Sequence, residues 1–420
     1  MSKLTLANRM YALHLPEFEQ EGLPMPGRAM NAIYPRFGKT YMDPEERERL
    51  EKEIIEGDYI DMGIGVYFRT HHSIIEAGKK SLDEGKTAYA DVTELRVAVS
   101  NKLWEENRIK ADPITNIALL SGATTGIAVC ALSLLEAGDH AVVLDPDYLR
   151  HGHCSVFAGA SLTRAPMPKR DGAYYFDPEI LAKAIRPNTK VLWVTNPTNP
   201  SGYLFSQEDC RAIADIAFKH NLWVVTNELY DALRYDGNSY CSLASIPGME
   251  ERTITIGGVS KNYDMTGFRL GWVAGPKMVI ANITDLLFFG CQASPPTTGQ
   301  WAALAALTQP LRTDYITEIM KIYHTSRNLI CDTLSSIPKV KCPRPMAGQF
   351  AFPDFSAVTQ DDLSLAQYLK QEAHILTISG SIWGYNARGH LRIALANPLE
   401  IQKKGLARME KALREYVKTH

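Results

Sequence analysis

Cysteine is sparse in this sequence, and its spacing suits neither a metal centre nor a disulfide framework. The seven cysteines stand at positions 130, 154, 210, 241, 291, 331 and 342, and they form no Cys-x-x-Cys pair. An odd number of widely spaced cysteines argues against a zinc site and against a disulfide-stapled fold. We therefore expect no bound metal and a reducing compartment, the cytoplasm.

An excess of charge of either sign is also lacking. The chain carries 45 Lys and Arg against 47 Asp and Glu, which gives a net charge of -2. Proteins that bind nucleic acid or anionic lipid usually display a strong basic surface. The charge balance therefore predicts a small-molecule partner and no nucleic-acid partner.

A run suited to crossing a membrane is missing as well. The one long uncharged stretch, residues 114–135, has about the length of a transmembrane helix. Polar residues and glycines interrupt it, namely Asn116, Ser121, Gly122, Thr124, Thr125 and Gly126. A strand, a tight turn and a helix account for it better. Because the first 22 residues also lack the apolar core of a signal peptide, we expect a cytoplasmic protein with no membrane partner.

The sequence does contain a regular alternation of short apolar runs and helical patterns, between residues 117 and 272. Such alternation is typical of an α/β domain with a largely parallel sheet. It predicts strands at 117–120, 140–145, 190–196, 222–228, 253–257 and 269–275. Helices are predicted at 124–138, ending at Gly138, and at 206–220.

The two ends of the chain have a different pattern. Helices are predicted at 43–56, 314–335, 361–372 and 401–417, and short strands at 349–352 and 390–395. A chain of 420 residues has room for two or three domains. We predict an N-terminal arm with part of a small domain at 1–74, a large domain at 75–310 and the rest of the small domain at 311–420.

Several motifs with well-known functions fail on inspection. Two Gly-Lys-Thr triplets suggest a P-loop, but the position where that loop needs its first glycine holds Ile33 in one case and Lys80 in the other. The Gly63-Ile-Gly65 pair lacks the third glycine of a dinucleotide-binding turn. His151 and His153 bracket a glycine without a third ligand at metal-site spacing, which disfavours a metal site.

Polar residues gather where the predicted strands end. Ser121-Gly-Ala-Thr124 follows one strand and opens a helix, a geometry that either binds phosphate or merely caps the helix. Lys261 follows another strand, and Arg269 stands eight residues later. Asn199 and Asn227 follow two further strands. Because ligands bind at the carboxyl ends of parallel strands, these residues predict one shared binding site.

Together these motifs resemble those of fold-type I pyridoxal phosphate (PLP) enzymes of the class I/II aminotransferase family, from about Asp61 to the C-terminus. The resemblance implies that Lys261 carries PLP as a Schiff base, within the large domain. Further implied PLP contacts are Gly122, Ala123, Thr124, Ser260 and Arg269 at the phosphate, with Tyr148, Asn199, Asn227 and Tyr230 at the ring.

The resemblance also implies residues outside the cofactor site. Arg392 matches the arginine that binds the substrate α-carboxylate, where Asn199 and Gly65 assist, and a guanidinium suits that task because it binds carboxylates with two hydrogen bonds. Tyr89 resembles a tyrosine that reaches the phosphate of the neighbouring subunit, which implies a homodimer. The implied substrates are an amino acid and a 2-oxo acid.

Three positions depart from the family pattern. The segment from Tyr89 to Arg96 is shorter than usual and lacks a glycine, and Gly258 stands where some members have a phosphate-binding serine. Asn227 replaces the aspartate that contacts the pyridine nitrogen. A carboxylate keeps that nitrogen protonated, whereas an amide offers a neutral hydrogen bond worth about 1 kcal/mol.

The leading hypothesis is an aminotransferase in which Lys261 moves the Cα proton. Because of Asn227, an alternative is a PLP enzyme of specialised metabolism that catalyses β- or γ-elimination or replacement, cyclisation or amino-acid oxidation. A third hypothesis is a non-catalytic amino-acid sensor joined to a DNA-binding domain, which the short acidic N-terminal segment and the intact Lys261 disfavour. If Asn227 faces the ring, Glu228 faces the opposite way, since adjacent strand residues alternate.

Overall fold

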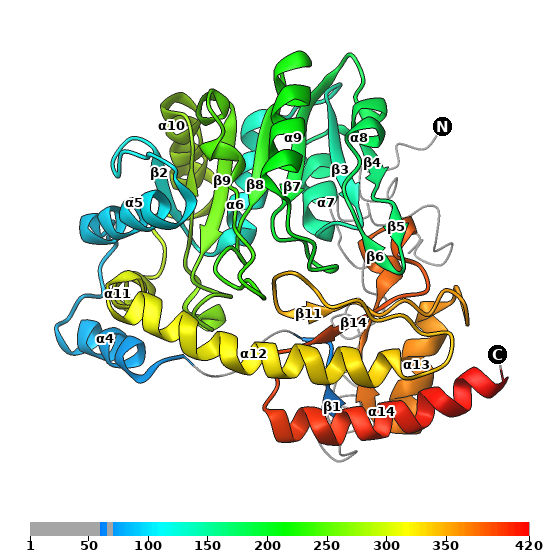
Figure 1. Ribbon diagram of the computed structural model, residues 1–420. Coiled ribbons are helices and arrows are strands. Elements are labelled where there is room, and N and C mark those ends of the chain that lie inside the picture. The colour runs from blue at the N-terminus through cyan, green and yellow to red at the C-terminus, as the bar shows by residue number, and fades with distance from the viewer. Residues whose placement is uncertain (1–58, 65–69, 420) are drawn as a thin grey trace, which may run out of the picture.

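A seven-stranded sheet organises the part of the chain that this computed structural model describes, residues 59–64 and 70–419 (Figure 1). The strands lie in the order β2-β10-β9-β8-β7-β3-β4, and β10 runs antiparallel to both of its neighbours. Their bounds are β2 (Ile117–Leu120), β3 (His140–Asp145), β4 (Ser161–Pro166), β7 (Thr189–Thr195), β8 (Trp223–Asn227), β9 (Thr253–Gly258) and β10 (Gly271–Ala274). The predicted α/β fold with a mostly parallel sheet is confirmed, although β4 has no counterpart among the predicted strands.

Helices cover both faces of this sheet, which explains why its inner strands are largely apolar and buried. On β3, Val143 packs into the cluster that α6 and α10 complete, whereas Val142 packs into the cluster beneath α9. Val225 and Val224 of β8 divide in the same way. The helices are α6 (Ala123–Leu134), α7 (Leu149–Phe157), α8 (Pro178–Ala184), α9 (Gln207–Lys219) and α10 (Lys277–Leu286).

Helix α6 ends earlier than its sequence pattern predicts. The prediction placed the end at Gly138, but the helix stops at Leu134 and Leu135 is already extended. Gly138 instead adopts φ +101° in a turn in which the Glu136 N–H donates to Asp139 Oδ2 at 2.9 Å. The glycine therefore serves the turn before β3 and not the helix end.

The C-terminal part of the chain packs beneath the carboxyl edge of the large sheet (Figure 1). Three short strands pair in the order β11-β14-β13, and β1 pairs with β12, so residues 60–61 lie beside the C-terminal third. Their bounds are β1 (Ile60–Asp61), β11 (Phe350–Ala351), β12 (Ile375–Leu376), β13 (Ile378–Ser379) and β14 (Leu391–Ala394). The division at 1–74, 75–310 and 311–420 remains a prediction, and the predicted helix at 43–56 lies outside the described residues.

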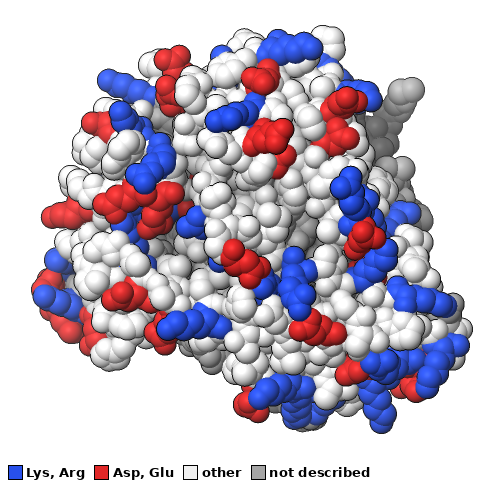
Figure 2. All heavy atoms as spheres, viewed as in Figure 1, with Lys and Arg blue, Asp and Glu red and all other residues white. Residues whose placement is uncertain are grey.

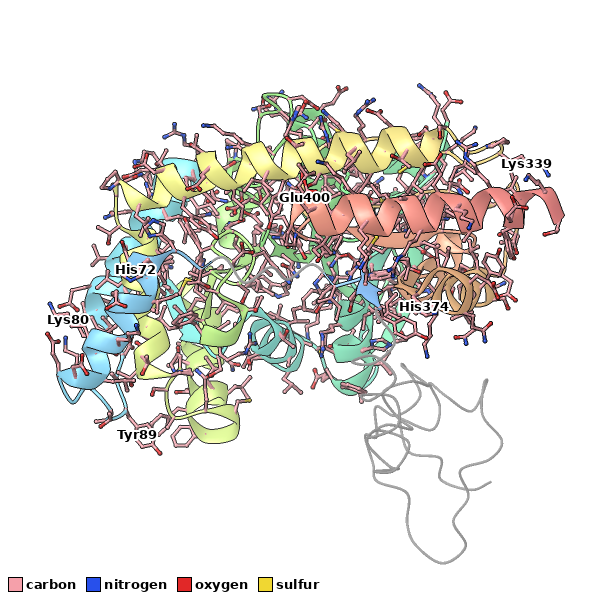
Figure 3. The ribbon with its side chains drawn as sticks, turned by 90° about the horizontal axis from the view of Figure 1, so that it is seen from below. His72, Lys80, Tyr89, Lys339, His374 and Glu400 are labelled. Atoms are coloured by element: carbon pink, nitrogen blue, oxygen red, sulfur yellow. The ribbon has the colours of Figure 1, made fainter. Side chains whose placement is uncertain are left out.

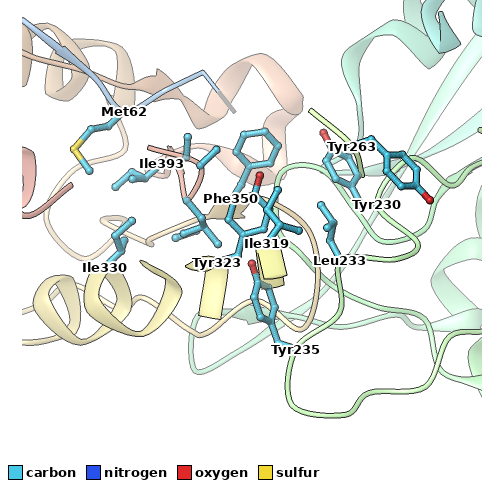
Figure 4. Close-up of a cluster of buried hydrophobic side chains, with 14 of the residues drawn as sticks. Met62, Tyr230, Leu233, Tyr235, Tyr263, Ile319, Tyr323, Ile330, Phe350 and Ile393 are labelled. Atoms are coloured by element: carbon cyan, nitrogen blue, oxygen red, sulfur yellow. The ribbon is translucent and has the colours of Figure 1, made fainter. Parts of the chain in front are cut away.

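One helix links these two regions, and several further elements complete the described part of the chain. A long helix, α12 (Leu311–Ser335), runs beneath both of them, and its Ile319 and Tyr323 share one buried cluster with Tyr230 and Phe350 (Figure 4). The other elements are α4 (His72–Asp83), α5 (Thr93–Asn107), α11 (Thr297–Leu307), α13 (Asp362–Ala373), α14 (Leu399–Thr419) and the hairpin strands β5 (Lys169–Arg170) and β6 (Ala173–Tyr174).

The visible surface mixes positive and negative side chains, and in the view of Figure 2 neither sign forms a continuous field. Among the described residues, no helix is both long and apolar enough to cross a membrane. The uncharged run at 114–135 folds as β2, a turn and α6, as the sequence predicts.

Candidate active site

The polar residues predicted to meet do line one cavity, which lies at the carboxyl edge of the large sheet and holds about 370 Å³. Because β10 is antiparallel to both β2 and β9, the carboxyl ends of β2, β3, β7, β8 and β9 all point the same way. From these ends and from the C-terminal part come Ala123, Thr124, Tyr148, Asn199, Asn227, Tyr230, Ser260, Lys261, Arg269 and Arg392.

The start of α6 meets Arg269 at one side of the cavity. Gly122 adopts φ +85°, and a Cβ built there would lie 2.3 Å from the guanidinium of Arg269. Two backbone carbonyls fix the position of the Arg269 guanidinium, which donates to Thr266 at 2.7 Å and to Ser121 at 3.3 Å. A glycine backbone, the first N–H groups of a helix and an arginine together suit a phosphate group.

Lys261 follows β9 and is half-buried at the cavity wall. Burial and the nearby cations Arg392 and Arg269 together lower the pKa of its amine to about 8, against the opposing carboxylate of Asp264. The amine is therefore deprotonated far more readily than that of an ordinary lysine. A neutral amine is what attack on an aldehyde requires.

Asn227 ends β8 and faces the cavity on the same side of the sheet as α6. Its Nδ2 lies 3.2 Å from His151 Nε2, while its buried Oδ1 has no hydrogen-bond partner within the described chain. A buried polar atom without a partner is costly unless a ligand supplies one. Glu228 faces away, since it accepts hydrogen bonds from Asn107 and Ser242 behind the strand.

Arg392 of β14 closes the cavity from the C-terminal side. Its guanidinium donates to Asn199 Oδ1 at 3.2 Å and to the Gly63 carbonyl at 2.8 Å. It also lies over the rings of Phe350 and Trp383, at 3.8 and 4.6 Å from their centroids. The planar group is thus fixed in position and presented to the cavity, as recognition of a carboxylate requires.

Tyr89 is a predicted site residue that does not line this cavity. Tyr89 is 85% exposed and projects from the edge of the molecule (Figure 3). Gly65 lies outside the described residues. The segment before it nevertheless reaches the site, because Asp61 Oδ1 accepts from the Gly63 N–H at 2.7 Å and Ile64 lines the cavity.

Other cavity residues escaped prediction from sequence. Phe350, Ile378 and Trp383 are apolar side chains from short strands and turns, and no spacing rule distinguishes them from ordinary core residues. His151, considered only as a metal ligand, instead supports Asn227. The pair Asp147 and His151 at i and i+4 on the strand-to-helix turn was the available signal.

A mostly parallel sheet with a lysine, an arginine and a helix start at its carboxyl edge places this chain among fold-type I enzymes. The chain belongs to the family of class I and II aminotransferases, whose model matches residues 57–405. It is 32% identical to the aspartate aminotransferase of Pyrococcus abyssi over 364 residues, which cover 85% of this chain and 92% of that protein.

Two further relatives agree with this assignment. Identity to aromatic-amino-acid aminotransferase 2 of Thermococcus litoralis is 31% over 367 residues, covering 86% of this chain and 93% of that one. The crystal structure of an aromatic aminotransferase from Pyrococcus horikoshii superposes with a TM-score of 0.82 at 30% identity, covering 87% of this chain and 98% of the other. The predicted aminotransferase activity is confirmed, and the alternative PLP chemistries are not favoured.

Proposed function

We propose that the cavity binds PLP, that Lys261 attaches it covalently, and that the enzyme transfers the amino group of an α-amino acid to a 2-oxo acid. The observation that carries this proposal is that Lys261, the start of α6 and Arg269 line one cavity, where burial and nearby cations also lower the pKa of the lysine amine to about 8. The buried, unpartnered Oδ1 of Asn227 adds a hydrogen-bonding group suited to the ring.

Each cofactor contact has a physical role in this proposal. The backbone of Gly122–Thr124, the Thr124 and Ser260 hydroxyls and Arg269 bind the phosphate. Tyr148 stacks on the ring, and Asn199 and Tyr230 bind its phenolic oxygen. Burial raises the pKa of Tyr230, so its hydroxyl stays protonated and remains a donor.

The substrate carboxylate is assigned to Arg392, with Asn199 and Gly65 beside it. Since Asn199 Oδ1 already accepts from Arg392, its Nδ2 is turned away from the guanidinium. When bound, PLP supplies an electron-withdrawing ring that stabilises negative charge at the substrate Cα. Lys261, whose amine would be free once the substrate amine has taken its place, would be the base that moves the proton of the substrate Cα.

A homodimer in the cytoplasm completes the proposal. The support for a second subunit is the exposure of large aromatic side chains, Tyr89 at 85% and Phe289 at 82%. All seven cysteines are free, as a reducing compartment requires. Sedimentation at working concentration should give twice the chain mass, and a fully active monomer would contradict the dimer.

The direct test mixes the PLP-loaded protein with a panel of amino acids and follows the cofactor spectrum. Aspartate and the aromatic amino acids come first, because the relatives named above are aspartate and aromatic aminotransferases. Conversion to the pyridoxamine form, reversed by a 2-oxo acid, is the expected result. Production of hydrogen peroxide, or release of a β- or γ-substituent without pyridoxamine, would contradict transamination.

A further inference from the structure

Asn227 is the cavity end of a chain of buried hydrogen bonds that leads to a carboxylate. His151 Nε2 lies 3.2 Å from Asn227 Nδ2, and His151 Nδ1 lies 2.7 Å from Asp147 Oδ2. The Thr195 hydroxyl donates to the other oxygen of Asp147 at 2.6 Å. All four side chains are at most 4% exposed, so water does not compete for these bonds.

The imidazole at the centre of this chain is held in one orientation. It stacks on the ring of Trp193 at 4.9 Å with an interplanar angle of 11°, and the ring of Tyr148 packs edge-on at 5.6 Å. Ser155 donates to the His151 carbonyl at 2.8 Å and accepts from Trp193 Nε1 at 2.9 Å. These contacts keep Nδ1 toward Asp147 and Nε2 toward Asn227.

The hydrogen bonds then have a determined direction. A carboxylate only accepts, so the proton of a neutral His151 sits on Nδ1, facing Asp147. Its bare Nε2 must accept, and Asn227 Nδ2 is the donor that meets it. The amide consequently turns its oxygen, and not its NH₂ group, toward the cavity, which agrees with the buried Oδ1 that has no partner in the described chain.

We propose that Asp147 and His151 are positioning residues that hold the Asn227 amide with its oxygen toward the pyridine nitrogen of PLP. This inference rests on the proposed cofactor site. An amide oxygen there accepts a hydrogen bond from a protonated ring nitrogen, whereas an NH₂ group would favour the unprotonated ring. No proton moves along the chain, which only fixes where the hydrogens lie.

The proposal assigns to Asp147 part of the task that a carboxylate at position 227 would perform. Its negative charge lies two hydrogen bonds from the cavity and acts through polarisable groups in a buried environment. Glu228 is adjacent in sequence but is committed to Asn107 and Ser242 on the other side of the sheet. The carboxylate of Asp147 thus supplies, through His151, the negative charge that the neutral side chain of Asn227 does not have.

The first test needs no cofactor, and its one variant, His151→Gln, serves only to assign the signal. Nitrogen NMR of the full chain with ¹⁵N-labelled histidine, assigned by the signal missing in His151→Gln, reports which ring nitrogen of His151 carries hydrogen. The expected result is a neutral ring protonated on Nδ1. Protonation on Nε2, or on both nitrogens, would overturn the proposal.

The second test loads ¹⁵N-labelled PLP and reads the ring nitrogen. Asp147→Asn should move its resonance toward that of the unprotonated ring, and adding Asn227→Asp to that variant should restore the protonated value. Asp171→Asn, whose side chain is 94% exposed, is the matched control and should change nothing. An unchanged resonance in Asp147→Asn would overturn the proposal. Failure of PLP to attach at Lys261 would instead contradict the cofactor site and leave the histidine result intact.

Discussion

Lys102 and Lys261 both have their amines removed from bulk water, yet the surrounding charges give them opposite chemistry. Burial of Lys102 favours the neutral amine, but the carboxylates of Asp231 and Glu106 outweigh it and raise the pKa. For Lys261, burial and the cation Arg392 act in the same direction and lower the pKa to about 8. Desolvation alone therefore does not produce a reactive lysine, and the sign of the neighbouring charge decides.

Strand β8 separates these two environments. Behind it, Lys102 donates to Asn107 at 2.7 Å and pairs with Asp231, while Asn107 donates to Glu228 at 2.9 Å. In front of it, the cavity holds about 370 Å³ and contains the unpartnered Asn227 Oδ1. Groups that satisfy one another stabilise the fold, whereas groups left unsatisfied around a space indicate a ligand.

The largest expected effect is the loss of activity when Lys261, the lysine at the cavity, is replaced. Lys261→Ala removes the attachment point and the base, so transamination should fall by at least the roughly 10²–10⁴-fold that one acid–base residue contributes. Steady-state assays of purified protein measure it. Lys183→Ala, a variant of a 79% exposed lysine, is the control and should keep parental turnover. An equal loss of turnover in both variants would contradict a specific role for Lys261.

The buried hydrogen-bonded cluster behind β8 should contribute to the stability of the fold. Lys102→Met leaves the buried carboxylate of Asp231 without its cation, so the free energy of unfolding should fall by about 3–5 kcal/mol. Urea unfolding measures this change. Lys80→Met, at a 75% exposed lysine paired with Glu84, should cost about 0–1 kcal/mol. A Lys102→Met protein of parental stability would show that the cluster is not structural.

Arg392→Ala should weaken productive binding of amino acids by about 2–5 kcal/mol, the range for removing one member of a buried charge pair. PLP should still bind, because its proposed phosphate contacts lie at the other side of the cavity. The measurement compares kcat/KM for an amino acid with that for the corresponding amine. If the variant discriminates between them as the parent does, the carboxylate binds elsewhere.

Glu228 provides a pH test of the buried cluster behind β8, which it forms with Lys102, Asn107 and Asp231. Burial raises its pKa from 4.5 to about 7, so between these values the folded protein binds more protons than the unfolded chain. Stability from this group is therefore lost as pH rises through that window, by about 3 kcal/mol in total at about 1.4 kcal/mol per pH unit. Thermal unfolding of Glu228→Gln should lack this fall, whereas the exposed Glu372→Gln should retain it. Identical pH profiles in the two variants would refute the assignment.

The smallest expected effect is a shift in a pH profile. Loading of the cofactor-free protein with PLP should accelerate as pH rises toward about 8 and level off above, because only the neutral Lys261 amine attacks. Arg392→Gln removes a cation that lowers this pKa, so its profile should move to higher pH. A shift to lower pH would mean that Arg392 does not act on the amine.

The sequence predicts the sheet and the motif residues better than it predicts their surroundings. Strand β3 matches its predicted bounds because a continuous apolar run between turn residues has few alternatives, and Lys261 and Arg269 follow local motifs. Asn227 and His151 are 76 residues apart, and Arg392 and Gly63 are 329 apart. Such contacts arise from strand order and from packing between distant segments, which local spacing does not encode.

The most direct test of the difference between the two lysines is borohydride reduction of the PLP-loaded protein, followed by peptide mapping. Lys261, with its pKa near 8, should carry the pyridoxyl group. Lys102, held as a cation by Asp231, should carry none. Label on Lys102 or on any lysine other than Lys261 would contradict both the site and the reasoning that distinguishes the two amines.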